Sequence, residues 1–379
     1  MEFIDLKSQY RTLEKEINAA IQKVLSHGAY IMGEEVAQLE AELSEYVGRK
    51  YCVSCANGTD AMVMLLMAWD IKQGDAVFVP SFTFMSTAEV VSLRGATPVF
   101  VDIDIDTFNI DVNSLEKAIE NVIAEGKLTP RAIIPVDLFG LPADYDRILP
   151  LAKKYGLFVL EDGAQGFGGT LNGKAACSFG EASTTSFFPA KPLGCYGDGG
   201  AIFTDDVELY SVLTSIRVHG KGTDKYDNVR IGVNSRLDTL QAAILLPKLK
   251  AFRENELAAR QKWADVYISQ LKGIVKTPEI PSGYTSSYAQ YTIQLENSVQ
   301  RDALQKKLKE NGIPSMVYYT KPLHLQGAYQ DLGYEKESLS NSVKASECVL
   351  SLPMHPYVSS EEVNNVANTI KAVLAEKNK

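Results

Sequence analysis

The chain has 379 residues, 45% of them hydrophobic, which is enough to bury one large core and a smaller second one. It contains no run of about 18 apolar residues, and its first residues lack the basic and apolar regions of a secretory signal. The formal net charge of -9 argues against a protein that coats nucleic acid, because counterion release needs clustered lysine and arginine. We therefore expect a cytoplasmic protein without membrane or nucleic-acid partners.

The five cysteines are an odd number in a long chain, which favours reduced thiols over a disulfide framework. Cys52 and Cys55 have the spacing of a metal or redox motif. However, no second pair of cysteines or histidines accompanies them, and their side chains would face opposite sides of a strand. The sequence thus predicts buried free cysteines and no metal site.

Two helices are predicted at the start of the chain, one with apolar residues at helical spacing from Leu13 to Leu25 and one over Glu34 to Tyr46. Strands and helices then alternate. The predicted strands are Tyr51 to Cys55, Ala76 to Val79, Pro98 to Val101, Ala132 to Val136, Leu157 to Leu160 and Ala201 to Thr204. The predicted helices between them are Thr59 to Trp69, Ser86 to Leu93, Asn113 to Ile123 and Tyr145 to Tyr155. This βαβ pattern is typical of a parallel sheet buried on both faces.

A long charged helix is predicted after Arg236 and runs towards Tyr267, beyond which the chain changes character. The last hundred or so residues mix shorter strands, Tyr288 to Leu295 and Ser315 to Tyr319, with charged helices. This mixture is typical of an α+β unit. We therefore predict a large domain over residues 1–248 and a small C-terminal domain over residues 249–379.

Lys191 and Asp162 are the two candidate catalytic residues. Lys191 lies in a stiff turn after a strand-like run, and its neighbours Phe187, Phe188, Pro189, Pro192 and Leu193 would desolvate the amine and lower its pKa. Asp162 follows the buried run that ends at Leu160. A lysine that can form a Schiff base, together with an acid that keeps a pyridine nitrogen protonated, suggests pyridoxal phosphate. Asp162 could instead cap a helix, but a metal is disfavoured because no histidine or second carboxylate lies at ligand spacing.

Further cofactor residues are expected at the carboxyl ends of other strands, where parallel sheets bind ligands. Gly58 and Thr59 form a tight turn at a helix start that suits a phosphate, although an ordinary capped glycine turn is the alternative. Ser186, five residues before Lys191, would lie beside the same phosphate. Of the two phenylalanines Phe82 and Phe84, one is expected in the core, and we assign Phe84 to stacking on the pyridine ring. Gln165 could donate a hydrogen bond to the cofactor's phenolate oxygen.

The order of these motifs resembles the DegT/DnrJ/EryC1/StrS family of sugar aminotransferases over nearly the whole chain. The matching segments are 28–33, 57–61, 81–84, 161–165, 186–191, 197–200, 232–236 and 322–326. The resemblance implies a fold-type I pyridoxal-phosphate transferase, with a mostly parallel seven-stranded sheet flanked by helices and a smaller α+β C-terminal domain. It implies that Lys191 bonds covalently to the cofactor, that Asp162 pairs with the pyridine nitrogen and that Gln165 lies near the phenolate. Gly58, Thr59 and Ser186 match phosphate ligands. Asn234 matches a phosphate ligand from the partner subunit, which implies a homodimer with shared active sites.

Three segments, 186–203, 232–246 and 351–357, resemble most closely the O-antigen enzymes that aminate a UDP-linked 3-keto-N-acetylhexosaminuronic acid. The implied product is UDP-2-acetamido-3-amino-2,3-dideoxy-glucuronic acid, with L-glutamate as donor, 2-oxoglutarate as by-product and pyridoxamine phosphate formed between the half-reactions. Relatives that aminate C4 of UDP- or dTDP-linked 4-keto-6-deoxy sugars share most of these motifs, so they remain an alternative. A catalytically silent cofactor-binding homologue is a second alternative, which the intact lysine, aspartate and glutamine disfavour.

Four residues are candidates for the sugar nucleotide. Arg236 could hold the uronate carboxylate with its planar guanidinium, or form an ion pair with Asp238, or start a helix. His324 could approach the sugar nucleotide or serve only in packing. Tyr30 and Ile31 match a family region that covers the sugar.

Overall fold

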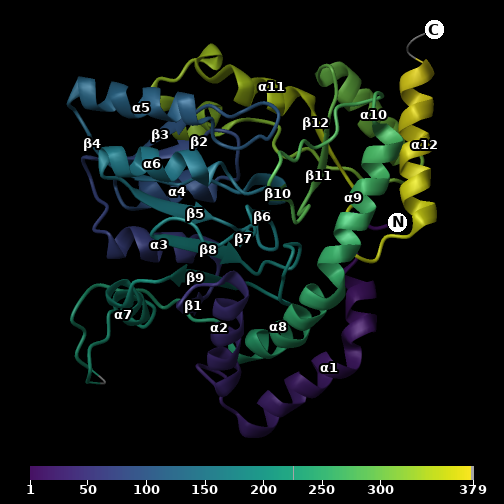
Figure 1. The fold of residues 1–379 in the computed structure, drawn as a ribbon. Helices are drawn as coiled ribbons and strands as arrows, with labels where there is room; N and C mark the ends of the chain where they lie inside the picture. Colours follow the sequence, from purple (N-terminus) through teal and green to yellow (C-terminus); the bar gives the residue numbers. More distant parts are fainter. Residues whose placement is uncertain (225, 377–379) are drawn as a thin grey trace.

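The computed structural model describes residues 1–224 and 226–376 of the chain. Its centre is a seven-stranded sheet with helices on both sides (Figure 1). From edge to edge the strands are β1 (Tyr51–Cys55), β9 (Gly200–Thr204), β8 (Ala182–Ser186), β5 (Phe158–Asp162), β4 (Thr129–Ile133), β2 (Asp75–Pro80) and β3 (Thr97–Val101). Only β9 runs antiparallel to its neighbours in this sheet. The predicted fold class, a mostly parallel sheet flanked by helices, is therefore confirmed.

Alternate residues of each strand face different helices, because successive side chains of a strand point to opposite faces. One face packs against α3 (Gly58–Ala68), α4 (Ser86–Leu93) and α7 (Val207–Ile216). The other face packs against α2 (Glu34–Val47), α5 (Val112–Glu125), α6 (Tyr145–Tyr155) and α8 (Thr239–Ala251). In β2, for example, Val77 and Val79 belong to the first layer and Phe78 to the second. Burial on both faces explains why strands such as β2 and β3 read as largely apolar runs.

A long helical path links the two ends of the molecule. Helix α1 (Leu6–His27) packs along α8, and α8 continues through a π-helical turn at Phe252–Glu256 into α9 (Leu257–Leu271). Figure 1 shows this path running from the bottom of the molecule to the C-terminal elements at the right. The long helix predicted after Arg236 is thus present, bent at the π-helical turn.

A second core forms from residues 264–374. It contains the strand pair β11 (Tyr291–Gln294) and β12 (Val349–Leu352) together with α9, α10 (Ser298–Glu310) and α12 (Ser360–Glu376). Helix α11 (Ser340–Cys348) packs beside α10. Short strands β6 (Thr170–Leu171), β7 (Lys174–Ala175) and β10 (Tyr284–Thr285) form a small separate sheet. The 3-10 turns are Leu138–Gly140, Leu323–Leu325, Gly327–Leu332 and Lys336–Leu339.

Two expectations for this half of the chain change. The segment predicted as a strand at Ser315 to Tyr319 is irregular, because only Met316 bridges Ser351. The partner of β11 is instead β12, which the sequence reading did not identify as a strand. The division at residue 248 stays a prediction; α8 runs through that residue, and Leu323 and Tyr329 pack on the sheet core rather than the second core.

The five cysteines are all buried and unpaired, as predicted. Across residues 1–224 and 226–376, no helix combines the length and apolar character that a membrane crossing requires. The same residues include no group of three or more His, Cys, Asp or Glu side chains arranged to hold a metal ion.

A buried ion pair fastens α2 to the end of α7. Arg217 donates to Glu40 over 2.5 Å and to the carbonyl oxygen of Ser54 over 3.0 Å, and Glu40 accepts from the amide of Ser54 over 2.8 Å. Both charged side chains are largely removed from water. Loss of one partner would therefore leave an uncompensated buried charge.

We predict that Glu40→Ala lowers the free energy of unfolding by about 3 to 5 kcal/mol, measured by chemical denaturation. The double variant Glu40→Ala with Arg217→Met should recover part of the loss, because it removes the charge left behind. A double variant as unstable as the sum of the two single variants would contradict a coupled pair.

Candidate active site

A cavity of about 670 Å³ lies at the carboxyl ends of β5 and β8. Its volume is in the range of small-molecule sites in proteins. The structure brings together here all the cofactor residues predicted within one subunit, namely Gly58, Thr59, Phe84, Asp162, Gln165, Ser186 and Lys191. These seven come from four separate segments of the chain, so their convergence follows from the sheet topology.

Asp162 ends β5 and points into the cavity from its floor, where it is 5% exposed. One carboxylate oxygen accepts from the Thr87 hydroxyl over 3.1 Å and the other from the Ala164 amide over 3.2 Å. Burial raises the pKa of Asp162, while the nearby charge of Lys191 acts in the opposite direction. Each oxygen can accept a further hydrogen bond, so the carboxylate can receive one from a ligand.

Lys191 occupies a tight turn after β8, closed by a bond from its own amide to the carbonyl oxygen of Phe188 over 2.9 Å. Its side chain lines the cavity. Burial lowers the pKa of Lys191, and the charge of Asp162 opposes that effect. A lysine with a lowered pKa holds more of its amine in the neutral, nucleophilic form near neutral pH.

The first turn of α3 meets β8 at very short range. Asn57 caps the helix by accepting from the Asp60 amide over 2.8 Å, and Gly58 and Thr59 follow it. A Cβ atom on Gly58 would lie 2.9 Å from Cβ of Ser186, and one on Gly200 would lie 2.6 Å from the carbonyl carbon of Asn57. The amide groups of a helix start and a serine hydroxyl therefore face the same small volume, an arrangement that suits an anion.

Gln165 has a fixed side-chain amide on the opposite side of the cavity. Its oxygen accepts from the Phe139 amide over 2.7 Å, which leaves its nitrogen to donate to the Tyr319 hydroxyl over 3.3 Å. Phe84 is 55% exposed and lies 6.4 Å from the ring of Tyr319, whereas Phe82 is fully buried in the core. The prediction that one of these two phenylalanines serves packing is confirmed.

The cavity wall includes further residues that the sequence did not predict as site residues, among them Asp198, Gln290, Tyr318 and Tyr319. The last three come from the C-terminal part of the chain, outside the segments that match the family. Tyr318 and Tyr319 end the segment that was read as a strand. Tyr319 is held by Gln165, and the oxygen of the Gln290 side chain is buried without a partner within the described chain.

Five predicted residues lie away from this cavity in the single chain. Asn234 is exposed and accepts from Arg236 over 2.7 Å, so Arg236 bonds to Asn234 rather than Asp238. Tyr30 and Ile31 are about half exposed, and Ile31 bridges Asp238. The two segments that carry these four residues, 30–31 and 234–236, thus lie close to each other beside residue 238.

His324, the fifth, is 1% exposed and forms a 2.6 Å hydrogen bond with the Ser81 hydroxyl through Nδ1. Its ring packs near Tyr334, at 6.1 Å between centroids. The structure does not bring its imidazole to the cavity wall. Within one chain, the geometry matches the packing alternative rather than contact with a sugar nucleotide.

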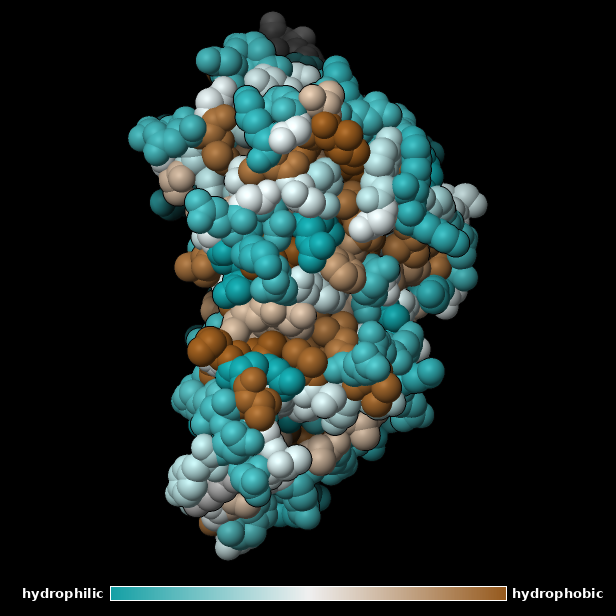
Figure 2. All heavy atoms as spheres, turned by 90° about the vertical axis from the view of Figure 1, so that its left-hand side faces the viewer, coloured by the Kyte–Doolittle hydropathy of each residue, from teal (hydrophilic) through white to brown (hydrophobic). Residues whose placement is uncertain are grey.

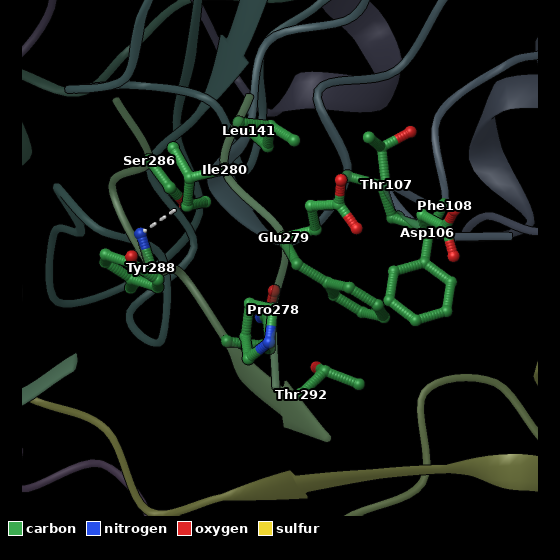
Figure 3. A pocket seen from close by; sticks show the side chains of 13 residues that line it. Asp106, Thr107, Phe108, Leu141, Pro278, Glu279, Ile280, Ser286, Tyr288 and Thr292 are labelled. Atoms are coloured by element: carbon green, nitrogen blue, oxygen red, sulfur yellow. Dashed lines mark hydrogen bonds between the residues drawn. The ribbon is translucent and has the colours of Figure 1, made fainter. Parts of the chain in front are cut away.

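A second hollow lies on the seam between the segment 106–108 and the segment 278–292 (Figure 3). Its volume is about 20 Å³, room for about one water molecule. Figure 3 shows Asp106, Thr107 and Phe108 on one side and Ile280, Ser286 and Tyr288 on the other, with Glu279 between them. Gln290 lines both this hollow and the large cavity, but only the large cavity can hold a ligand of cofactor size.

The fold is that of an α/β protein, and its cavity brings a lysine and an acid together as in a lysine-dependent transferase. Comparison with known proteins identifies the family. Residues 11–371 match the model of the DegT/DnrJ/EryC1/StrS aminotransferase family, and the chain belongs to that family. It is therefore a pyridoxal-phosphate-dependent sugar aminotransferase, as the sequence predicted.

Three relatives illustrate the match. A UDP-2-acetamido-2-deoxy-3-oxo-D-glucuronate aminotransferase of Pseudomonas aeruginosa is 50% identical over 366 residues, which cover 96% of this chain and 97% of that protein. A DegT DnrJ EryC1 StrS aminotransferase from Brucella abortus, solved as a crystal structure, is 52% identical with a TM-score of 0.95, covering 98% of this chain and 99% of that one. DesV of S. venezuelae, solved in complex with a ketimine intermediate, is 34% identical with a TM-score of 0.93 and 98% coverage of both chains.

We predict that Gly58→Ala lowers the affinity for pyridoxal phosphate at least about tenfold, because its methyl group would force α3 away from Ser186. The measurement is titration of the apoprotein with the cofactor. Gly327→Ala is the matched control, since a Cβ there meets no atom within 4 Å. Equal affinities of the two variants would contradict the close approach of α3 and β8 as a cofactor requirement.

Proposed function

We propose that this chain transfers an amino group from L-glutamate to the ketone of a UDP-linked 3-keto-N-acetylhexosaminuronic acid. The product would be UDP-2-acetamido-3-amino-2,3-dideoxy-glucuronic acid, a precursor for O-antigen or another surface polysaccharide. The observation that carries the substrate assignment is the 50% identity, over nearly the full length of both chains, to the P. aeruginosa enzyme named for that 3-oxo-glucuronate. The site supports the reaction class, because a lysine and an acid converge in one cavity.

The residues present fit pyridoxal 5'-phosphate. Lys191 has a lowered pKa and no ion pair among the described residues, so its amine is available to the aldehyde. Asp162 is a buried acid with free hydrogen-bonding capacity, suited to a protonated pyridine nitrogen. Gly58, Thr59 and Ser186 would hold the phosphate, and Gln165 the phenolate oxygen. When bound, the cofactor supplies an electron sink for the carbanion that amino transfer requires.

The residues of the chain then divide the remaining work. Lys191 would accept a proton from the donor carbon and deliver it in the return half-reaction, since a neutral amine is an effective base near neutral pH. Asp162 would hold the ring-nitrogen proton in place throughout. Phe84 would stack on the pyridine ring of the cofactor and fix its orientation. The cavity walls would exclude water from the reacting atoms. Glutamate would enter in one half-reaction and the keto sugar in the other, with 2-oxoglutarate released between them, leaving the cofactor as pyridoxamine phosphate.

A homodimer would complete the site. Asn234 is exposed, Arg236 is half-buried, and both lie away from their own cavity, so in this proposal they reach the cavity of the partner subunit. Tyr30, Ile31, Met32, Val229 and Ile231 are large apolar side chains left exposed in one chain. The loop after α7 projects at the lower left of Figure 1, on the side that Figure 2 shows, where apolar side chains gather in patches within a polar surface. Such exposure is typical of a protein-protein contact.

We predict that Lys191→Ala abolishes turnover and removes the visible absorbance of the lysine-linked cofactor. Asp162→Ala should retain some bound cofactor, because the phosphate ligands remain, but reduce turnover at least about a hundredfold through loss of the ring-nitrogen partner. Stopped-flow absorbance with L-glutamate measures both effects. Turnover retained by Lys191→Ala would refute the assignment of that lysine.

We predict that the pyridoxamine form of the enzyme reacts faster with the UDP-3-keto uronate than with UDP- or dTDP-4-keto-6-deoxy sugars. The measurement is recovery of the aldehyde form across a panel of these substrates. Arg236→Gln should raise KM for the uronate at least about tenfold with less effect on kcat, because it removes the cationic partner of the carboxylate. A faster reaction with a 4-keto-6-deoxy sugar would identify a 4-aminotransferase instead.

A further inference from the structure

Two carboxyl groups meet in the core directly behind the cavity. Glu161 precedes Asp162 on β5, so its side chain points to the opposite face of the sheet, and Asp137 follows the bridge between Val136 and Asp162. Both acids are 0% exposed, and each lies close enough to the other to influence its pKa. Within the described chain neither acid forms an ion pair with a lysine or arginine.

The hydrogen-bond donors around the pair indicate which carboxylate oxygens already accept a hydrogen bond and which one does not. Glu161 accepts from the amides of Cys177 and Phe179, and Asp137 accepts through Oδ1 from the Ala143 amide over 3.0 Å and the Tyr145 hydroxyl over 2.8 Å. Oδ2 of Asp137 is buried and has no hydrogen-bond partner within the described residues. Two neighbouring buried carboxylates cannot both stay ionised without a cation, so the pair must hold a proton, and Oδ2 of Asp137 is an oxygen free to carry it.

Burial raises the pKa of Asp137 to about 7, and burial together with the charge of Asp137 raises the pKa of Glu161 well above its ordinary value. The other titratable groups facing the pair are Tyr145 from α6, Cys177 from the segment before β8, Tyr284 from β10 and Asp162 from β5. Burial also raises the pKa of the Tyr145 hydroxyl and of the Cys177 thiol, so both stay neutral at physiological pH.

The pair is joined to the two groups that would hold the cofactor ring. The Asp137 amide donates to the carbonyl oxygen of Asp162 over 3.1 Å. The bonds of Asp137 to Ala143 and Tyr145 close the turn at residues 138–143, and the Phe139 amide in that turn fixes the side chain of Gln165. A Cβ on Gly166 would lie 2.3 Å from Oδ2 of Asp137, so the backbone after Gln165 also rests on this acid.

We propose that Asp137 and Glu161 form a proton-sharing pair of positioning residues that fixes Asp162 and Gln165 from behind the sheet. The inference rests on the proposed function, but the pair itself belongs to the apoprotein. Asp137 sets the turn that orients Gln165, and the shared proton keeps the two acids together without a cation. The pair touches neither cofactor nor substrate; it acts through the residues that do.

The first test measures the thermal unfolding of the apoprotein between pH 5 and pH 8. An acid whose pKa is higher in the folded state binds a proton there that the unfolded chain has released, so stability falls as pH rises through that window. Asp137→Asn should remove this dependence, because its amide can donate to Glu161, which then becomes an ordinary carboxylate with three donors. We expect Tm to fall about 2 °C less per pH unit in Asp137→Asn than in the wild type.

The matched control is Glu45→Gln, which removes an exposed carboxylate on α2 and should leave the wild-type pH dependence unchanged. A pH dependence of Tm identical in Asp137→Asn and the wild type would overturn the shared proton. Because no cofactor is present, this outcome is independent of the test on Lys191, and failure of the proposed function would leave it unaffected.

The second test measures pyridoxal phosphate affinity. Asp137→Ala removes the acceptor for Ala143 and Tyr145, so we expect affinity to fall about tenfold, whereas Asp137→Asn retains that acceptor and should stay within about threefold of the wild type. A purely structural role would show equal effects in the two variants after matching for Tm, and that result would overturn the positioning role. If Asp137→Ala does not fold, a tenfold loss in Asp137→Asn serves as the overturning result.

Discussion

The active site depends on the free-energy cost of burying an acid, Asp162, and an amine, Lys191, in the same cavity. Burial raises the pKa of Asp162 and lowers that of Lys191, while their mutual attraction pulls both values back. The pKa values of the two groups are therefore shifted towards each other, which favours reversible proton transfer. The sheet provides this environment, because parallel strands end at one edge with helices on both sides.

The regular elements of the sheet core could be predicted because they depend on local signals. Fully buried strands read as apolar runs, and the helices between them begin at residues such as Asn57 and Asp111 that cap them. The segment at 315–319 does not form the predicted strand because it follows an irregular path, with Met316 exposed, the other residues only partly buried, and one bridge to Ser351. β12 was missed because its four residues, 349–352, are too short to be distinguished from the adjoining helix.

The site residues also divide into those that the sequence could predict and those that it could not. Residues within motifs, such as Asp162, Ser186 and Lys191, could be assigned because Asp162 follows a predicted strand and the other two lie along or just after a strand-like run. Tyr319 and Gln290 could not, since they reach the cavity only through packing of the C-terminal part against the sheet. The contact between Asp137 and Glu161 was equally inaccessible, because it depends on the register of β5 beside the bridge at Val136. Register across parallel strands leaves no local trace in the sequence.

The single antiparallel strand of the large sheet couples the two ends of the cofactor site. β9 returns beside β8 so that Ser186 pairs with Gly200, and Gly200 in turn lies against Asn57 at the start of α3. A slip of β9 by one residue would turn every side chain of that strand to the other face. A slip that brought Ala201 opposite Ser186 would place its methyl group against the backbone of Asn57. An insertion or deletion between residues 187 and 199 that altered the pairing in this direction would therefore disturb the anion-binding turn, even though it lies outside that turn.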